Sequence, residues 1–336
     1  MNPNIKLATA AAVLTLAGCG GGSSGNSSGG SGTVSIGLSD APVDDVKEVT
    51  VEVDSITLKM TGAKDIVIDR FTSDQLGIVD ADTFQINLLD YQGSAQAIVI
   101  DQLQLPAGKY SDLRLKILDE DINKSYVTEL DDTRKELKVP SEELKLGGFT
   151  IDAGSVQTFT IDFNLRHALV YRTVGTGGSY ILKPQSVDLV ENASAAELSG
   201  TIDSSLFNSV TPCDAKAEPT AGNVVYLYSG HSLNESSLAD VYDAELSATT
   251  IPDGAIAPYS SKSPVQQDAG GWKYDFGYLP AGDYTLVFSC DAASDSPEDY
   301  DGITLPLPTD QKVELTLEEG TASTCNLPIV DGACGS

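Results

Sequence analysis

The chain has 336 residues, a length typical of two domains, and its 41% hydrophobic content is enough for packed cores. Its 49 acidic residues outnumber 20 basic ones, which gives a net charge of −29. This balance argues against binding of nucleic acid, whose phosphates need Lys and Arg partners, and against docking on anionic lipid. The acidic excess indicates a solvated surface.

The N-terminus has the pattern of a secretory signal that ends at a lipid attachment site. Residues 7–17 form an apolar stretch that is too short for a stable membrane anchor. Leu16-Ala17-Gly18-Cys19 resembles the lipobox of bacterial lipoproteins, in which the cysteine thiol receives a diacylglyceryl group. Gly20, which stands where inner-membrane lipoproteins have Asp, implies by the same resemblance export to the outer membrane. We therefore expect residues 1–18 to be a signal peptide.

The segment that follows the signal predicts a tether. Residues 20–32 are Gly, Ser and one Asn, so no apolar group is available for burial and a flexible coil is expected. Residues 19–32 would thus be a flexible tether with the lipid on Cys19. The sequence leaves open whether the protein lies on the periplasmic or the surface face of the membrane. The folded part is expected to start near Thr33.

Alternation of hydrophobic and polar residues, rather than helical periodicity, dominates residues 33–192. Within residues 155–165, Phe159, Ile161, Phe163 and Leu165 alternate with polar residues, which predicts a strand with one buried face and one solvent face. Between residues 49 and 60 the hydrophobic positions fall in two phases, Val49, Val51 and Val53, then Ile56, Leu58 and Met60. A β-bulge near Asp54-Ser55 would let both sets face the core.

A six-residue phrase occurs twice, as LPAGKY in residues 105–110 and as LPAGDY in residues 279–284. Its Pro cannot donate to a β-ladder and ends the preceding segment, while its Gly permits the positive φ of a tight turn. Its Tyr then begins a strand with a large amphipathic ring. The phrase predicts a turn that starts a core strand in each of two β-sandwich modules.

Short motifs spread over residues 33–190 resemble the domain family DUF4382, which is found in bacterial and archaeal envelope lipoproteins. In family order they are LSDAP at 38–42, LPAGKYSDLRLKI at 105–117, LKVPS at 137–141, GGFTI at 147–151, DFN at 162–164 and ILKP at 181–184. The resemblance implies an all-β domain, expected over residues 33–192, without an established activity. Arg166 and His167 differ from many members, so no role is transferred to them.

A polar stretch at residues 190–196 leads to a second module at 196–336, which contains 22 acidic residues, 4 lysines and no arginine. Its predicted strands resemble, in order and phrase, the carboxypeptidase-regulatory-like and transthyretin-like sandwiches, some of which bind carbohydrate while others space or stiffen surface proteins. The expected fold class is therefore all-β, with two antiparallel β-sandwich domains of the Ig-like or prealbumin-like kind. Fold alone does not choose a function.

The cysteines other than Cys19 all lie in the second module, and they are Cys213, Cys290, Cys325 and Cys334. An even number in an exported domain indicates two disulfides, for which three pairings exist. Cys290 shares the phase of the hydrophobic positions in its strand and should face inward. We favour Cys213–Cys290 and Cys325–Cys334, with free buried thiols as the alternative.

The sequence contains no recognised catalytic or zinc motif, so we expect a protein that is not an enzyme. His167 and His231 have no zinc-ligand spacing, and Ser229 near His231 has no nucleophile elbow. No cofactor is expected, although calcium is a candidate for the acidic loop that contains Asp119, Asp121 and Asn123. The closing carboxylate of an EF-hand loop is missing there, so we expect weak binding or none; a solvated turn is the alternative.

Aromatic residues of the second module are candidates for a sugar-stacking platform, chiefly Trp272, Tyr274 and Tyr278. The alternative is that most of them pack in the core. We expect a cell-envelope lipoprotein with a non-catalytic binding or adhesive role; the alternatives are a carbohydrate-binding module that serves polysaccharide capture and a structural spacer in an envelope assembly. Exposure of Trp272 would favour the carbohydrate role. The expected partners are the membrane, through the lipid, and a glycan or an envelope protein, but no nucleic acid.

Overall fold

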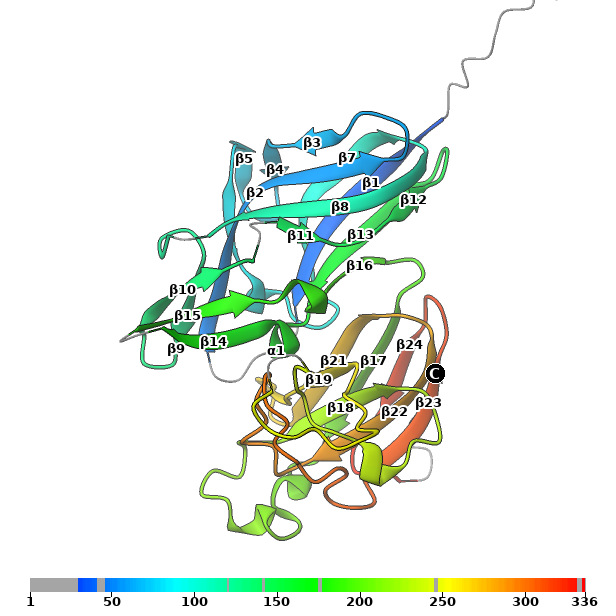
Figure 1. The fold of residues 1–336 in the computed structure, drawn as a ribbon. Coiled ribbons are helices and arrows are strands. Elements are labelled where there is room, and N and C mark those ends of the chain that lie inside the picture. The colour runs from blue at the N-terminus through cyan, green and yellow to red at the C-terminus, as the bar shows by residue number, and fades with distance from the viewer. Residues whose placement is uncertain are drawn as a thin grey trace, which may run out of the picture.

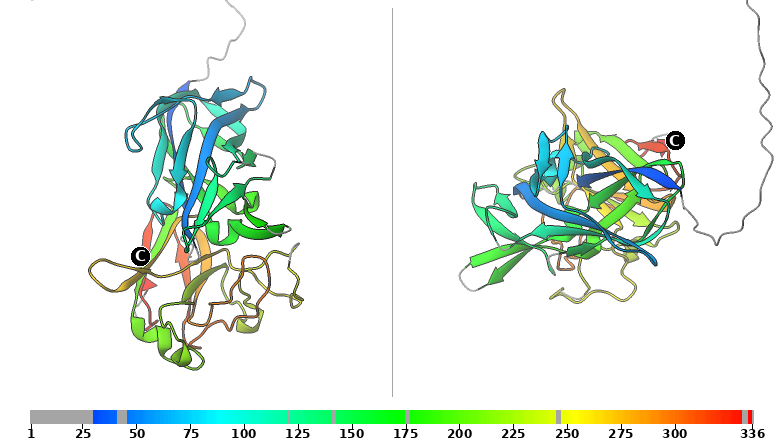
Figure 2. Two further views of the ribbon diagram at one scale, coloured as in Figure 1. Left: turned by 90° about the vertical axis from the view of Figure 1, so that its left-hand side faces the viewer. Right: turned by 90° about the horizontal axis from the view of Figure 1, so that it is seen from above.

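Two groups of β-sheets follow one another along the chain and form two modules stacked end to end (Figure 1). The computed structural model describes residues 30–40, 46–119, 121–140, 143–174, 177–244, 247–330 and 334–335. The predicted signal peptide and Cys19 lie outside these residues. The view turned by 90° shows the same stacking (Figure 2).

The first module has a four-stranded sheet in the order β16-β13-β1-β7 and a ten-stranded sheet along β11-β8-β2-β9-β10-β15-β14. The strands of the smaller sheet are β1 (Ser31–Asp40), β7 (Ala97–Pro106), β13 (Val156–Phe163) and β16 (Val187–Glu191). Those of the larger sheet are β2 (Val46–Met60), β3 (Ile66–Ile68), β6 (Phe84–Asn87), β8 (Gly108–Leu118), β9 (Tyr126–Glu129), β10 (Arg134–Lys138), β11 (Glu143–Lys145), β12 (Phe149–Ile151), β14 (Leu169–Val174) and β15 (Gly177–Leu182). The remaining elements are β4 (Phe71–Ser73), β5 (Ile78–Ala81), η1 (Leu88–Asp90), α1 (Leu165–Ala168) and η2 (Pro184–Ser186).

The second module has a five-stranded sheet in the order β20-β21-β17-β24-β25 and a four-stranded sheet in the order β19-β18-β22-β23. Its strands are β17 (Ala196–Ile202), β18 (Val224–Ser229), β19 (Ser260–Lys262), β20 (Val265–Gln266), β21 (Trp272–Leu279), β22 (Gly282–Ser289), β23 (Lys312–Leu317), β24 (Ala322–Cys325) and β25 (Cys334–Gly335). Its short 3-10 helices are η3 (Ser204–Asn208), η4 (Cys213–Ala215) and η5 (Glu235–Ser237).

The predicted all-β class is confirmed. Neighbouring strands are antiparallel except for three parallel pairs, β1 with β13, β10 with β15, and β17 with β24. The sequence analysis had expected antiparallel sandwiches throughout. Alternation records which side chains share a face of a strand, but it does not record the direction of the neighbouring strand.

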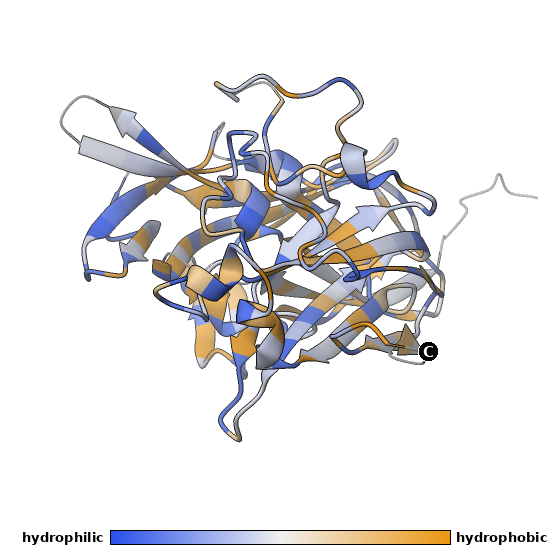
Figure 3. Cartoon of the chain, turned by 90° about the horizontal axis from the view of Figure 1, so that it is seen from below, coloured by the Kyte–Doolittle hydropathy of each residue, from blue (hydrophilic) through white to orange (hydrophobic). Residues whose placement is uncertain are grey.

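Among the described residues, buried hydrophobic side chains form one core cluster in the first module and two in the second. On β13, Phe159, Ile161 and Phe163 are at most 3% exposed, as the alternation predicts. Each such side chain contributes about 1.5–3 kcal/mol to stability through burial. Hydrophobic positions recur along the strands when the molecule is seen from below (Figure 3).

The change of phase in β2 is a β-bulge, as predicted. The register between β2 and β8 shifts between Val53 and Ser55. Val53 and Ile56, on either side of the extra residue, are both completely buried. One inserted residue therefore keeps the whole 15-residue strand facing a single core.

The repeated LPAGxY phrase turns the chain from one sheet of a sandwich into the other. In each module the strand before it and the strand after it belong to different sheets. The Tyr110 hydroxyl donates to the Pro106 carbonyl at 2.9 Å, and the Tyr284 hydroxyl donates to the Pro280 carbonyl at 2.8 Å. A buried tyrosine thus closes both corners, a device also seen in immunoglobulin-like sandwiches. The Gly of the phrase has a φ of +145° in the first module and +156° in the second.

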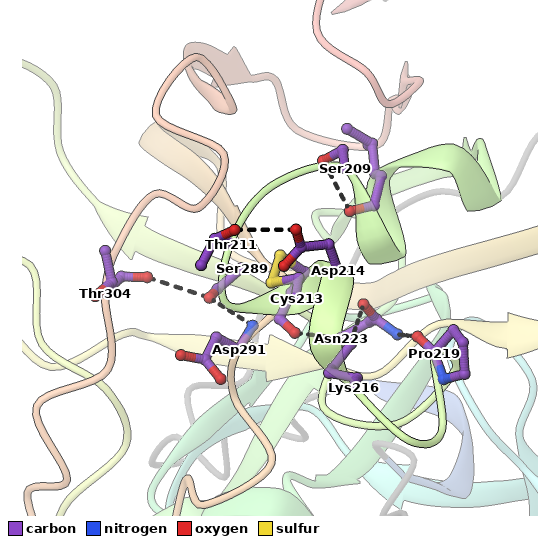
Figure 4. The surroundings of a disulfide bond; sticks show 12 residues. Ser209, Thr211, Cys213, Asp214, Lys216, Pro219, Asn223, Ser289, Asp291 and Thr304 are labelled. Carbon is purple, nitrogen blue, oxygen red and sulfur yellow. Dashed lines mark hydrogen bonds between the residues drawn. A yellow bond between two sulfur atoms is a disulfide. The ribbon is translucent and has the colours of Figure 1, made fainter.

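Both favoured disulfides are confirmed: Cys213 is bonded to Cys290, and Cys325 is bonded to Cys334. The first bond joins the η4 segment to the end of β22, 77 residues along the chain. In the chain-entropy model, closing a loop of that length stabilises the fold by about 4 kcal/mol. Lys216 donates to the Cys290 carbonyl at 2.8 Å and holds the same loop (Figure 4).

Gly200 on β17 provides a test of how closely the strands of the second module pack. A Cβ at this position would overlap the Cys325 carbonyl oxygen and lie 2.7 Å from the Tyr274 ring. Gly200→Ala should therefore lower the free energy of unfolding, measured with urea, by about 1–3 kcal/mol. Gly177→Ala is the control, because a Cβ there meets no described atom within 4 Å. Equal effects of the two changes would contradict this packing.

Candidate functional site

The two modules meet at a junction of polar side chains. The first module contributes α1 and the adjoining ends of β13 and β15, and the second contributes β19 and the loops at residues 239–244 and 291–299. The link between them is short and held by hydrogen bonds: the Asn192 amide donates to the Thr158 carbonyl at 2.9 Å. The junction therefore holds the modules in one relative position.

A buried carboxylate lies at the centre of this junction. Asp295 of the second module, whose side chain is 0% exposed, accepts from the Arg166 guanidinium of α1 at 2.9 Å. It also accepts from the Tyr226 hydroxyl at 2.7 Å and from the Val241 amide at 3.1 Å. Burial raises the pKa of the Asp295 carboxyl, while Arg166 and these hydrogen bonds oppose the rise. Removing one partner would leave a buried group without compensation.

Two further ion pairs cross the junction with the same polarity. Lys183 lies 3.0 Å from the carboxylate of Asp243, and Arg172 lies 2.9 Å from that of Glu298. As with Arg166 and Asp295, the cation belongs to the first module and the carboxylate to the second. Part of the acidic excess of the second module is therefore complementary to the surface on which it rests.

Lys262 on β19 reverses this polarity. It is only 4% exposed, and burial lowers the pKa of its ammonium, while the negative charges of Asp162, Asp40 and Asp275 oppose the fall. Burial also raises the pKa of the Asp162 carboxyl to about 6, against the attraction of Lys262. The junction thus contains a lysine and several carboxyls whose charged forms are disfavoured by their surroundings.

Backbone contact completes the junction. A Cβ at Gly277 would overlap the carbonyl oxygen of Gly93, so the two glycine segments touch directly. The next residue, Tyr278, donates its hydroxyl to the Ser94 carbonyl at 2.9 Å. Only a glycine permits this approach of β21 to the first module.

A histidine and a serine are paired at the junction, which the sequence analysis did not anticipate. His167 Nε2 lies 3.2 Å from the Ser261 hydroxyl, a distance that suits a nucleophile and its base. Burial and the positive charges of Arg166, Lys183 and Lys262 lower the pKa of His167 to about 3. An imidazole with so low a pKa is a weak base at neutral pH, and Ser261 is completely buried. The pair is therefore better suited to joining the modules than to catalysis.

Two of the three aromatic ligand candidates are buried. Tyr274 is 2% exposed and donates its hydroxyl to the Cys325 carbonyl at 2.6 Å. Tyr278 is 6% exposed and belongs to the junction. Neither ring can offer a face to a sugar, which corrects that hypothesis. Both share the phase of Trp272 on β21, and alternation does not tell a core aromatic from an exposed one.

Trp272 differs, because it is half-buried and borders a surface hollow. The hollow has a volume of about 530 Å³, and its lining includes Trp272, Asp203 and Asn326. The ring of the buried Phe207 lies 5.2 Å from the indole at an angle of 74°. The register pairs Trp272 with Ile202, at the end of β17 away from the linker. The second module therefore has a partly open aromatic ring in a concave setting.

The acidic loop considered for calcium uses its oxygens within the protein. One Asp119 carboxylate oxygen accepts from the Val139 amide at 2.8 Å, and one Asp121 oxygen accepts from the amide and side chain of Asn123. Within the described residues no group of three or more His, Cys, Asp or Glu side chains could hold a metal ion. Weak calcium binding or none stays the prediction for this loop.

The sequence analysis missed the junction residues, including Thr160 and Asp162. Thr160 and Asp162 lie on the face of β13 that alternation assigned to solvent, yet Thr160 is completely buried. The second module covers that face, where Asn164 lies 3.4 Å from the Ser260 hydroxyl. An aspartate and a threonine on a predicted solvent face gave no reason to expect a partner.

Two β-sandwich modules joined by a buried polar junction, one of them crosslinked by disulfides, define a two-module all-β protein. Residues 31–184 match the family model described as "Domain of unknown function (DUF4382)", so the first module is a DUF4382 domain. The family description names no activity. Within the described part of the chain, no helix is long and apolar enough to cross a membrane.

None of the curated proteins matches this chain. Similar solved structures include the Bacillus anthracis TIE protein, a candidate cell adhesion protein of Bacteroides fragilis and a minor pilin of Streptococcus agalactiae. Their identities are 11%, 8% and 12%, and their TM-scores are 0.17, 0.21 and 0.18. The alignments cover 89%, 90% and 87% of this chain and 34%, 95% and 94% of the others, so it spans about a third of the TIE protein. TM-scores this low support no statement about what this chain binds.

Asp295→Ala tests the junction. The change would leave Arg166 and Tyr226 buried without their shared acceptor, and breaking a buried ion pair from one side costs about 3–5 kcal/mol. We expect a loss of that size in the free energy of unfolding, measured with urea. Asp82→Ala removes one of the two exposed carboxylates that pair with Arg70 and should have little effect. Wild-type stability of Asp295→Ala would show that the pair does not hold the modules together.

Asp162→Asn tests the electrostatics of the junction. Because the folded protein holds the Asp162 proton more tightly than the unfolded chain, the stability from this group is full below pH 3.8 and is lost as the pH rises through about 6. The variant should match the wild type at pH 4 and be more stable at pH 7, by about 2–3 kcal/mol.

Urea unfolding at the two pH values measures this difference. Asp121→Asn should give the opposite sign, because hydrogen bonds from Asn123 lower the pKa of Asp121. If the difference in stability between Asp162→Asn and the wild type did not change with pH, the fold would not raise the pKa of the Asp162 carboxyl.

Proposed function

We propose that this chain is a cell-envelope protein, held on the outer membrane by a lipid on Cys19, with a non-catalytic binding or adhesive role. The observation that carries the proposal is the position of the start of β1. Strand β1, which begins at Ser31, starts at the end of the first module that is remote from the second (Figure 1). A tether attached there would hold the first module near the membrane and the second away from it.

The buried junction supports the same role. Three ion pairs and the Gly93–Gly277 contact hold the modules as one body, so the second module would not fold back onto the membrane. An anchored protein that meets a partner at a distance benefits from such stiffness, because less conformational entropy is lost on binding. A structural spacer would use the same geometry.

A carbohydrate-binding role is the second candidate function, and the state of Trp272 favours it. The spacer alternative has no use for a half-buried tryptophan that borders a hollow, whereas a sugar site uses the accessible part of an aromatic ring. Tyr274 and Tyr278 are buried, so the role would depend on Trp272 and its polar neighbours.

Cys19→Ser tests the anchoring. In cells that express the full chain, the wild type should incorporate labelled fatty acid and sediment with the membranes. The variant should do neither, because serine lacks the thiol that accepts the lipid. Fractionation and label incorporation are measured side by side, with Cys213→Ser as a control that changes a disulfide cysteine. A labelled, membrane-bound Cys19→Ser protein would contradict the anchor.

Adhesion is tested with beads coated with the wild-type protein. The beads should bind envelope preparations or cell-surface polysaccharide, and an excess of free protein should compete for this binding. Beads that bind neither material would leave the binding role without support.

A further inference from the structure

We propose that the hollow beside Trp272 is a subsite for a neutral glycan, with one pyranose ring packed against the indole. The inference rests on the proposed binding function and names the chemistry of its ligand. The volume of about 530 Å³ lies in the usual range of ligand sites. Such sites combine an apolar surface with a few polar groups that fix orientation, and this hollow has both.

The indole is held as a fixed stacking surface. Phe207, 2% exposed, packs edge to face with Trp272, and Trp272 pairs with Ile202 in the sheet. The backbone and one side of the ring are therefore fixed by the core while part of the ring stays accessible. A rigid aromatic ring loses little conformational entropy when an apolar sugar face covers it.

An amide of known orientation stands beside the ring. The Asn326 side-chain oxygen accepts from the Thr201 amide at 2.9 Å and from the Thr201 hydroxyl at 2.8 Å. Its NH₂ group therefore points away from Thr201 with two donors, and Asn326 is exposed. Asp203 also lies on the lining. Its Oδ1 accepts from the Ser205 amide, and its other carboxylate oxygen adds an acceptor to the rim. Sugar hydroxyls both donate and accept, so a donor and an acceptor on one rim suit them.

The rim that faces solvent is open. Gly270 and Gly271 lie at the turn between β20 and β21, and a Cβ on either would meet no described atom within 4 Å. Asn326 and Lys273 are likewise exposed. A site with one open side admits an internal unit of a long chain, whereas a closed cavity would admit only a free small molecule.

Charge selects a neutral ligand over an acidic one. The second module contains 22 acidic residues against 4 lysines. Lys262 is buried at the junction, Lys216 donates to the Cys290 carbonyl, and Lys312 donates to the Leu233 carbonyl. The lining contains one lysine, Lys273, and one aspartate, Asp203, so a uronate or sulfate would meet repulsion from the acidic module without a cluster of cations to bind it.

The chain contains a single tryptophan, so selectively excited tryptophan emission reports on Trp272 alone. The soluble protein from Ser24 onward, which keeps every described residue, is titrated with neutral gluco-, xylo-, manno- and galacto-oligosaccharides and with matched uronate oligosaccharides. We expect at least one neutral series to change the emission with saturation, at a Kd of about 1 mM or tighter. The uronate series should bind less tightly.

Asn326→Asp gives the decisive comparison. The substituted carboxylate can still accept from Thr201 but has no NH₂ donors, so the fold is retained while affinity falls about tenfold. Asn234→Asp adds the same charge at an exposed position that is not on the lining, and it should keep wild-type affinity. Trp272→Phe, assayed by calorimetry, should weaken binding as well.

Three results would overturn the inference. These are the absence of a response to every neutral series, preference for uronates, and unchanged affinity in Asn326→Asp. If no glycan binds but the lipid-anchored protein still binds envelope material through a protein partner, the proposed function stands and only the glycan subsite is rejected. If neither glycan nor envelope material is bound, both fall.

Discussion

The buried pairing of Asp295 with Arg166 and Tyr226 is the interaction on which the arrangement of this protein depends. A carboxylate without exposure is stable only where donors replace its lost water, and those donors come from both modules. Separating the modules would expose or orphan these charges. The parallel pairs Lys183–Asp243 and Arg172–Glu298 repeat the same polarity, so the acid-rich second module fits a complementary surface rather than an arbitrary neighbour.

Both modules use the same local structure where the chain passes from one sheet to the other. A sandwich needs its chain to leave one sheet and enter the other, and both modules do this at LPAGxY, where a buried tyrosine returns a hydrogen bond to the proline carbonyl. The second module adds a disulfide between Cys213 and Cys290, which fixes a long loop segment that contains little regular structure. The corner and the crosslink stabilise the modules individually, whereas the charged junction relates one to the other.

This division of roles is consistent with a protein that is anchored at one end and recognises something at the other. The chain enters the first module opposite the junction, and the Trp272 hollow lies at the end of its strand pair away from the linker. Between the two lie the Gly93–Gly277 contact and the ion pairs. In the proposed role, this stiff body would separate the recognition site from the tether, with the DUF4382 domain next to the membrane.

Features that depend on neighbouring residues in the chain were readable from the letters alone. The bulge after Val53, the corners at Tyr110 and Tyr284 and the inward face of β13 follow from alternation and turn chemistry. The count of four cysteines indicated two disulfides but allowed three pairings, of which the favoured one is observed. The sequence did not show what packs on a polar face of a strand. Alternation shows which side chains share a face, but not which residues contact that face. Thr160 and Asp162 therefore looked solvent-exposed but lie under the second module, and the β21 aromatics looked alike although Tyr274 and Tyr278 are buried and Trp272 is half-open. Burial depends on residues that lie far apart in the sequence, such as Tyr278 and Ser94 at a separation of 184, and only the packed chain brings them together.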